Sequence, residues 1–227
     1  MKTMPVWQFN EFQPVGVDYA DQAVAEQYDG FHQRFRGDMG AEADRLLDEL
    51  GVLPGQTLID LGCGTGTFAI QAARRCARVY AADVSDAMLA VARRKADAAG
   101  VRNIYFAQEG FLTYAHPDAP VDFLTSTAAL HHLPDFWKYT ALRRIHGMVK
   151  EGGLFYLLDT VYSFPADDYA RFFAEKTAWF TEHTGEEFGQ DVIRAFSEEF
   201  CTIDWIMEGL LMKAGFTIER ADYPDGM

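Results

Sequence analysis

The sequence predicts an α/β fold in which a doubly wound, mainly parallel sheet carries helices on both faces. Short apolar runs alternate with segments of helical period, an order typical of strands joined by crossover helices. Three glycines on alternate positions, Gly62, Gly64 and Gly66, follow the first apolar run, and Asp83 directly follows the second. Because such sheets bind ligands beyond the carboxyl ends of their strands, we expect the functional site at these two positions.

Composition restricts the partners of the protein. The chain has 227 residues, which suits a single domain over 1–227, and 49% of them are hydrophobic. Its net charge of −14 argues against nucleic acid as the main partner, because that affinity depends on lysine and arginine contacts to phosphates. No apolar run would span a bilayer, and three scattered cysteines suit neither a disulfide framework nor a zinc site. We expect a cytoplasmic protein with a small-molecule partner, either a monomer or a homodimer.

The expected elements follow from periodicity and from the residues that end it. Residues 1–17 are irregular because prolines and a glycine interrupt any period, and Ser85 is a typical helix N-cap. The expected helices are Asp18–His32, Ala41–Leu50, 67 to about 75, 85–100, Phe136–Val149 and Thr202–Ala214. The expected strands are Thr57–Leu61, Arg78–Ala82, Asn103–Ala107, Val121–Thr125, Leu154–Leu158 and Phe216–Tyr223, with a turn at 150–153 before the fifth.

The position of each glycine separates the possible nucleotide ligands. A dinucleotide fingerprint needs its third glycine at position 67, where this chain has Thr67, and no Gly-Lys-Ser/Thr follows, which excludes a P-loop. Asp60, just before the first glycine, would repel a pyrophosphate but suits a cationic ligand. The pattern Asp-x-Gly-x-Gly-x-Gly at 60–66 closely resembles the first motif of class I S-adenosylmethionine (SAM) methyltransferases. The alternative is an unrelated glycine-rich turn.

The resemblance covers about Ala41 to Tyr223 and implies a Rossmann-like sheet of the seven-stranded type. Such sheets close with a hairpin whose last strand inserts antiparallel beside the fifth strand. The chain has no residues left for it after the turn at 224–226, so we expect that strand to be absent from the sequence given. The resemblance also implies SAM as cofactor and S-adenosylhomocysteine (SAH) as product.

Cofactor contacts are implied at the ends of the first four strands. Asp83 would accept hydrogen bonds from both ribose hydroxyls. Val84 and Met88 would line the adenine, although a methionine at helical spacing is more often a core residue. Many family members read Gly-Asp where this chain reads Glu109-Gly110, so Gln108 and Glu109 are both candidates for the adenine amine, and Phe111 would stack on the ring or fill the core. The full set is Asp60, Gly62, Cys63, Gly64, Gly66, Asp83, Val84, Met88, Gln108, Glu109, Gly110, Phe111 and Thr127.

A pair of histidines marks the end of the fourth strand. The stretch 130–135, Leu-His-His-Leu-Pro-Asp, resembles the motif of the small-molecule and quinone branch that lies beside the methyl group. Adjacent histidines point apart, so we expect them to share no metal ion and predict no metal site. One would cap the next helix or reach the substrate. The catalytic residue stays unknown; if the acceptor needs a base, the candidates are His131, His132, Tyr28 and His183.

Two segments flank the predicted SAM-binding core at 41–160. The stretch 25–29, Ala-Glu-Gln-Tyr-Asp, resembles a family segment that folds over the cofactor, so residues 1–40 would cover it; the alternative is a surface helix that buries Tyr28 and Phe31. Residues 161–201 are rich in aromatics and exceed the one crossover helix that the fold needs. They would roof the substrate site, form a dimer interface, or make a helical pair with its own core.

The sequence therefore predicts a methyltransferase that moves the methyl group of SAM by in-line displacement to a small, partly apolar acceptor. Such a transfer needs no covalent intermediate, so positioning of the reactants supplies most of the acceleration. Three other functions remain open: use of a SAM derivative such as carboxy-SAM, binding of SAM without turnover, and NAD-linked oxidoreduction. Thr67 and Asp60 count against the last.

Overall fold

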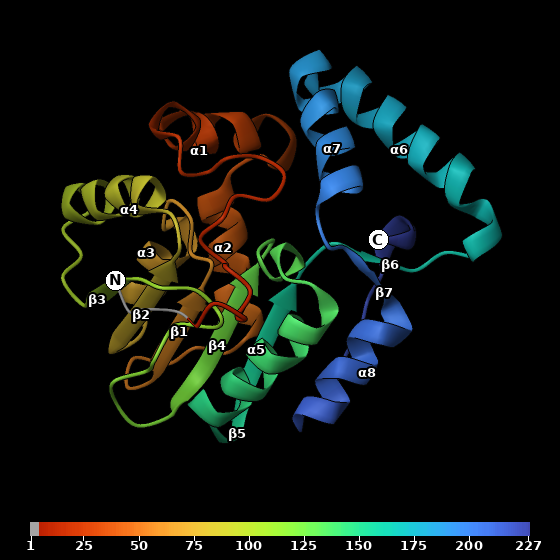
Figure 1. The fold of residues 1–227 in the computed structure, drawn as a ribbon. Coiled ribbons are helices and arrows are strands. Elements are labelled where there is room, and N and C mark those ends of the chain that lie inside the picture. Colours follow the sequence, from red (N-terminus) through yellow and green to blue (C-terminus); the bar gives the residue numbers. More distant parts are fainter. Residues whose placement is uncertain (1–4) are drawn as a thin grey trace.

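A computed structural model describes residues 5–227, the side chain of residue 35 apart, and its centre is a parallel sheet (Figure 1). Its strands are β1 (Thr57–Leu61), β2 (Arg78–Asp83), β3 (Ile104–Gln108), β4 (Val121–Thr127) and β5 (Val149–Leu158). They lie in the order β3-β2-β1-β4-β5. The chain builds outward from β1 to β3 and then crosses back to β4, so the strand order reverses between β1 and β4. Ligands of doubly wound sheets bind at this switch point.

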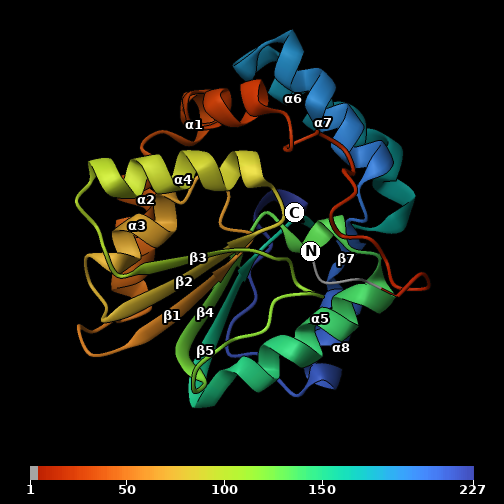
Figure 2. The same cartoon turned by 60° about the vertical axis from the view of Figure 1, so that its left-hand side comes forward.

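Helices cover both faces of the sheet (Figure 2). On one side lie α2 (Met39–Glu49), α3 (Thr67–Ala73) and α4 (Asp86–Ala98), and on the other lie α5 (Asp135–Met148) and α8 (Asp204–Ala214). Neighbouring residues of β1 contribute to the two cores: Leu58 packs with α2, α3 and α4, and Ile59 packs with α5 and α8. Strands buried on both faces are apolar at nearly every position, which is why the pattern could be read from the sequence. The predicted α/β class is confirmed.

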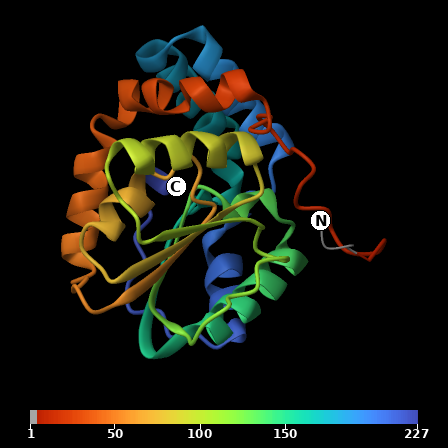
Figure 3. The same ribbon diagram turned by 90° about the vertical axis from the view of Figure 1, so that its left-hand side faces the viewer.

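A further layer lies beyond the carboxyl ends of the strands (Figures 1 and 3). It consists of α1 (Gln22–Arg36), which packs against α4, and of α6 (Tyr169–Thr184) and α7 (Glu186–Glu198), which pack against each other. The rings of Phe31 on α1 and Phe188 on α7 have centroids 5.0 Å apart. A short parallel pair, β6 (Val161–Tyr162) and β7 (Thr202–Ile203), joins the two ends of the insertion. The short 3₁₀ turns are η1 (Leu130–His132), η2 (Ala166–Asp168) and η3 (Pro224–Gly226).

The sixth strand predicted at Phe216–Tyr223 is wrong, because this segment forms no strand. Instead, its side chains contact α5, β5 and α8. The ring of Phe216 contacts those of His146 and Phe155, and the hydroxyl of Tyr223 donates to Glu208 at 2.9 Å. Alternating polarity indicates that one face of a segment is buried, but it does not identify a strand partner. Within residues 5–227, no strand pairs with the outer edge of β5.

The boundaries of other elements also differ from the prediction, most clearly those of β5, α1 and α8. The turn expected at 150–153 lies inside β5, which begins at Val149, and the register with β4 shifts between Val121 and Phe123. The first helix begins later than expected, because Asp21 caps it by accepting from the backbone N of Ala23 at 2.7 Å. The last helix likewise begins two residues late, after β7. No helix within residues 5–227 has both the length and the apolar character needed to cross a membrane.

Candidate functional site

The glycine turn after β1 is the starting point of the site. All three glycines have positive φ, 75° for Gly62, 52° for Gly64 and 75° for Gly66. A Cβ at Gly62 would lie 2.3 Å from the Cβ of Ala129, and one at Gly66 would lie 2.9 Å from the Cβ of Ala92. A Cβ at Gly64 would meet no atom of residues 5–227 within 4 Å, as far as these are described. Two glycines therefore permit close packing of the turn, and the middle one leaves backbone open to a ligand.

Asp83 links the end of β2 to this turn. Its Oδ2 accepts from the backbone N of Gly64, and its Oδ1 accepts from the backbone N of Ser85, both at 2.8 Å. The hydroxyl of Ser85 in turn caps α4 by accepting from the backbone N of Met88 at 3.0 Å. Burial raises the pKa of Asp83, and the backbone hydrogen bonds from Ser85 and Gly64 lower it in part. The carboxylate thus holds the two loops together at the switch point.

Asp60 is the second buried acid of the turn. Its side chain is almost fully buried, and its Oδ1 accepts from the hydroxyl of Thr125 at 3.0 Å. Burial raises its pKa to about 7, Thr125 lowers it and the nearby Asp83 raises it further. Among the described residues, no basic side chain contributes to this pKa. The carboxylate is therefore placed where a cationic ligand would stabilise its ionised form.

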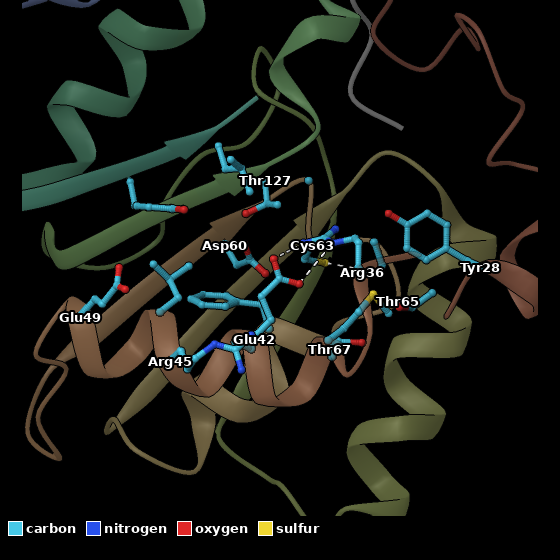
Figure 4. A pocket seen from close by; sticks show the side chains of 18 residues that line it. Tyr28, Arg36, Glu42, Arg45, Glu49, Asp60, Cys63, Thr65, Thr67 and Thr127 are labelled. Carbon is cyan, nitrogen blue, oxygen red and sulfur yellow. Dashed lines mark hydrogen bonds and ion pairs between the residues drawn. The ribbon is translucent and has the colours of Figure 1, made fainter. Parts of the chain in front are cut away.

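A cavity of about 260 Å³ opens beside the turn, between α2 and the ends of β4 and β5 (Figure 4). The labelled side chains of Tyr28, Arg36, Glu42, Asp60 and Thr127 surround it. An Nη atom of Arg36 lies 2.8 Å from a carboxylate oxygen of Glu42, so this charge is paired. The other lining residues are Met39, Ala43, Arg45, Leu46, Glu49, Gly62, Cys63, Gly64, Thr65, Thr67, Phe68, Tyr156 and Leu158.

The two histidines after β4 lie side by side. Their ring centroids are 4.4 Å apart, so the expectation that they point apart is wrong; both lie on the tight 3₁₀ turn η1. The Nδ1 of His131 pairs with a carboxylate oxygen of Asp159, and its Nε2 lies 3.3 Å from an oxygen of Glu199. Neither histidine caps the next helix, whose N-cap is Pro134 with no side-chain bond. The sequence did not mark Asp159 or Glu199 as partners of this pair.

The pKa values of the two imidazoles shift in opposite directions. Burial lowers the pKa of His131, but the charges of Asp159 and Glu199 outweigh it and the net shift is upward. Burial lowers the pKa of His132 to about 3, with the neighbouring His131 contributing. His132 is therefore a neutral imidazole at physiological pH. His183 lies apart from this pair: it is exposed on α6, where its ring stacks on Trp179.

Comparisons with known proteins show which family residues 58–153 resemble. A family model described as a methyltransferase domain matches residues 58–153. An uncharacterized methyltransferase of Geobacillus kaustophilus is 31% identical over 142 residues, which are 61% of this chain and 64% of that protein. The chain contains a class I SAM-dependent methyltransferase domain.

Two further matches are a curated enzyme and a solved structure. A demethylmenaquinone methyltransferase of Geobacillus stearothermophilus is 29% identical over 118 residues, which are 51% of this chain and 50% of that protein. The structure of a DhpI–SAH complex is 26% identical with a TM-score of 0.53, over 64% of this chain and 68% of that chain. The match thus spans 64% and 50% of the lengths of the two curated relatives.

Helix α1, which precedes the matched methyltransferase region, is held against the glycine turn by side-chain bonds. Asp29 on α1 accepts from the hydroxyl of Thr65 and pairs with Lys95 of α4. The Nζ of Lys95 also donates to the hydroxyl of Thr67 at 2.6 Å. Ala25, from the same Ala-x-x-Tyr-Asp segment, packs against α4, and Tyr28 lines the cavity. The structure therefore places this segment over the turn.

Residues predicted near adenine do not line the cavity. Met88 is 2% exposed and packs against α1, and Phe111 is buried in the core beneath α5. The Nε2 of Gln108 donates to the carbonyl of Val84 at 3.3 Å, and Glu109 accepts from the backbone N of Ala115 at 3.2 Å. Of the predicted cofactor residues, the cavity brings together Asp60, Gly62, Cys63, Gly64 and Thr127.

Glu11 is a further residue near these strand ends that the sequence did not indicate. Its carboxylate accepts from the backbone N of Leu112 at 2.9 Å and from the hydroxyl of Thr113 at 2.7 Å. A Cβ at Gly110 would lie 2.4 Å from the Oε2 of Glu11. The N-terminal segment thus places a carboxylate where a side chain at position 110 would stand. Local sequence carries no signal for a contact over 101 residues.

Proposed function

We propose that this protein transfers a methyl group from SAM to a small, partly apolar acceptor. The observation that carries the proposal is the buried carboxylate of Asp60, which has no basic partner among the described residues and faces a cavity beside the open backbone of Gly64. A buried carboxylate of this kind favours a cationic ligand. The family of the domain supplies the identity of that ligand as SAM.

The residues around the cavity fit the charges of SAM. Its amino-acid end carries a carboxylate and an ammonium, and the cavity offers Arg36 for the first and Asp60 for the second. Asp83 lies on the other side of the turn, where its remaining lone pairs suit the ribose hydroxyls. When bound, SAM supplies a methyl group made electrophilic by its sulfonium. The contribution of the chain is to bind, to orient and to exclude water, and orientation alone is worth about 7–11 kcal/mol for well-aligned reactants.

The methyl acceptor would bind beside α1, the loop after β4 and the α6–α7 insertion. Tyr19 and Tyr28 pack edge to face at 5.9 Å, and Tyr19 also contacts the ring of His132. Aromatic surfaces of this kind suit a planar, partly apolar acceptor. The similarity to a demethylmenaquinone methyltransferase supports a quinone-like or phenolic compound as the first class to test. No general base is assigned.

Binding is the first test of this function. Calorimetry with SAM and with SAH should show one site per chain, and Asp60→Asn should weaken both ligands, because both carry the ammonium proposed to contact Asp60. A matched control is Asp122→Asn, whose carboxylate at the opposite end of the sheet accepts from Thr57 and pairs with Lys150. Absence of measurable affinity for both ligands in the intact protein would overturn the proposal.

Turnover is tested with methyl-labelled SAM and a panel of quinols, phenols and other small acceptors. Labelled product is expected from an aromatic acceptor. Carboxy-SAM is the second candidate, and it would need a basic residue beside the methyl position in addition to Arg36, which is proposed for the amino-acid carboxylate. Mass spectrometry of the ligand that copurifies with the protein separates these cases. Tight SAM binding without label transfer to any acceptor of the panel or of a cell extract would favour a non-catalytic binder.

A further inference from the structure

We propose that His131, His132 and Glu199 form a binding site for a divalent transition-metal ion of the zinc type, with Asp159 orienting His131. Each of the three residues offers one ligand atom, and these atoms all lie within 4.8 Å of one another. The sequence predicted no metal site, because it predicted that the two imidazoles point apart. The proposal does not depend on methyl transfer, since metal binding can be measured without SAM.

The spacing between two of the ligand atoms suits a shared ion. The Nε2 of His131 and the Oε2 of Glu199 are 3.3 Å apart. A charge-assisted hydrogen bond between such atoms is about 2.7–2.9 Å long. Two ligands held tetrahedrally at bonds of about 2.0–2.1 Å lie about 3.3–3.4 Å apart. The observed separation is therefore that expected of two ligands of one ion, and a ligand atom of His132 lies within 4.8 Å of both.

Asp159 supplies the orientation that a ligating histidine needs. When an ion binds at Nε2 of His131, the pairing of Nδ1 with Oδ1 of Asp159 would hold the ring proton on Nδ1 and leave the lone pair of Nε2 for the ion beside Glu199. Histidines that bind metals usually donate their other ring nitrogen to a carboxylate in this way. The Oδ2 of Asp159 is buried and has no hydrogen-bond partner among the described residues, and the side chain is only 1% exposed. An unpaired buried carboxylate oxygen is an independent sign that a polar or charged group belongs here.

The buried charges of the cluster also favour a bound cation. The side chains of Asp159 and Glu199 are 1% and 6% exposed, so two carboxylates are buried next to two imidazoles. The nearby buried ammonium of Lys138 already bonds the carbonyl of Phe200 and, at 2.8 Å, Asp135. Burying two carboxylates without a cation is costly, and a divalent ion balances both.

The position of the cluster indicates what a bound ion would do in the fold. His131 and His132 follow β4, Asp159 follows β5 and Glu199 follows α7, so the ion would tie the insertion to the carboxyl edge of the sheet. The backbone N of Phe200 already donates to the carbonyl of His131 at 3.0 Å. The cluster also borders the side proposed for the acceptor, where His132 contacts Tyr19. A metal with three protein ligands keeps a position open to water or to an acceptor oxygen.

The test uses the full chain, freed of metal by a chelator and dialysis. Zn²⁺ is titrated calorimetrically, bound metal is counted by mass spectrometry, and Co²⁺ serves as a spectroscopic probe of ligand geometry. We expect one ion per chain and visible Co²⁺ bands of a four- or five-coordinate site. Loss of a ligand in His132→Ala or Glu199→Gln should weaken Zn²⁺ on the order of 100-fold, and Asp159→Asn about 10–100-fold.

Matched controls are available next to the site. Glu198→Gln changes an exposed neighbour of Glu199, His183→Ala removes an exposed histidine of the insertion, and Cys201→Ser tests the nearby thiol. These three variants should bind Zn²⁺ as the unaltered protein does. The proposal is overturned if the unaltered protein binds no stoichiometric Zn²⁺, as would follow if His131 only bridges the two carboxylates as an imidazolium. It is also overturned if Glu199→Gln and Glu198→Gln retain equal affinity and identical Co²⁺ spectra.

Discussion

The carboxylate of Asp83 accepts a hydrogen bond from the backbone N of Gly64 at 2.8 Å, so the end of β2 fixes the turn that follows β1. The same carboxylate accepts from Ser85 at the start of α4. One side chain therefore determines both the shape of the glycine turn and the position of the helix beside it. Any ligand bound by the turn depends on Asp83, whether or not it contacts that residue.

Asp83→Ala should weaken SAH binding tenfold or more. The variant loses the acceptor for Gly64 and the lone pairs proposed for the ribose hydroxyls, each worth about 1 kcal/mol or more. Calorimetry measures the affinity. The control is Asp86→Ala, an exposed acid in the first turn of α4 whose nearest ion-pair contact is 3.8 Å from Arg93. Equal affinities of the two variants for SAH would contradict the role of Asp83.

Asp60 should make SAM binding dependent on pH. In the free protein its pKa is raised to about 7 by burial, so the carboxylate is largely protonated below pH 7 and ionised above it. A cationic ligand binds the ionised form, and affinity should therefore fall as the pH is lowered from 8 to 6, approaching tenfold per unit below the pKa. The measurement is the ratio of SAM affinities of the unaltered protein and Asp60→Asn at each pH, which cancels titration of the ligand. A ratio that is flat between pH 6 and 8 would argue against this coupling.

Gly62→Ala should destabilise the fold more than Gly51→Ala. Both glycines have positive φ, 75° and 66°, so each substitution pays a backbone penalty of roughly 1–2 kcal/mol. A Cβ at Gly51 meets no atom within 4 Å, whereas one at Gly62 lies 2.3 Å from the Cβ of Ala129. The collision should add about 1–3 kcal/mol to the loss in free energy of unfolding. Urea unfolding of the two variants measures this difference, and equal midpoints and slopes would refute the packing argument.

Glu11→Ala should loosen the N-terminal segment. Truncation leaves the backbone N of Leu112 and the hydroxyl of Thr113 without their acceptor, at a cost of about 1–3 kcal/mol for a buried unpaired donor. Hydrogen exchange should rise around residues 8–13 and 110–114. The exposed Glu26→Ala, which breaks only a surface pair with Arg94, is the control and should leave exchange in both segments unchanged.

A double-mutant cycle sharpens this prediction. Gly110→Ala places a Cβ 2.4 Å from the Oε2 of Glu11 and 2.7 Å from a methyl of Val84. In the background of Glu11→Ala one of these collisions is gone, so Gly110→Ala should cost less stability there than in the unaltered protein. Strict additivity of the two substitutions would show that Glu11 does not occupy the space beside Gly110.

Much of the candidate site could be predicted because it is local in sequence. Asp60, the three glycines and Asp83 lie on two consecutive strand–turn–helix units, where strand ends and positive-φ glycines leave a clear pattern. The partners of the histidine pair could not be predicted in this way. Glu199 reaches His131 only because the α6–α7 insertion folds back over the sheet, and no period or motif encodes that return.

The sequence alone determined the α/β class, the position of the glycine turn and the identity of its two acids, because apolar periodicity and backbone constraints act over neighbouring residues. Only the tertiary structure decided which distant side chains meet: Glu11 with Gly110, Asp29 with Lys95, and His131 with Asp159 and Glu199. The strand predicted at 216–223 is wrong for the same reason. Its polarity does alternate, but its side chains pack on α5 and α8 and no neighbouring strand pairs with it among the described residues. Contacts between distant segments depend on how whole elements pack, and that information is not local.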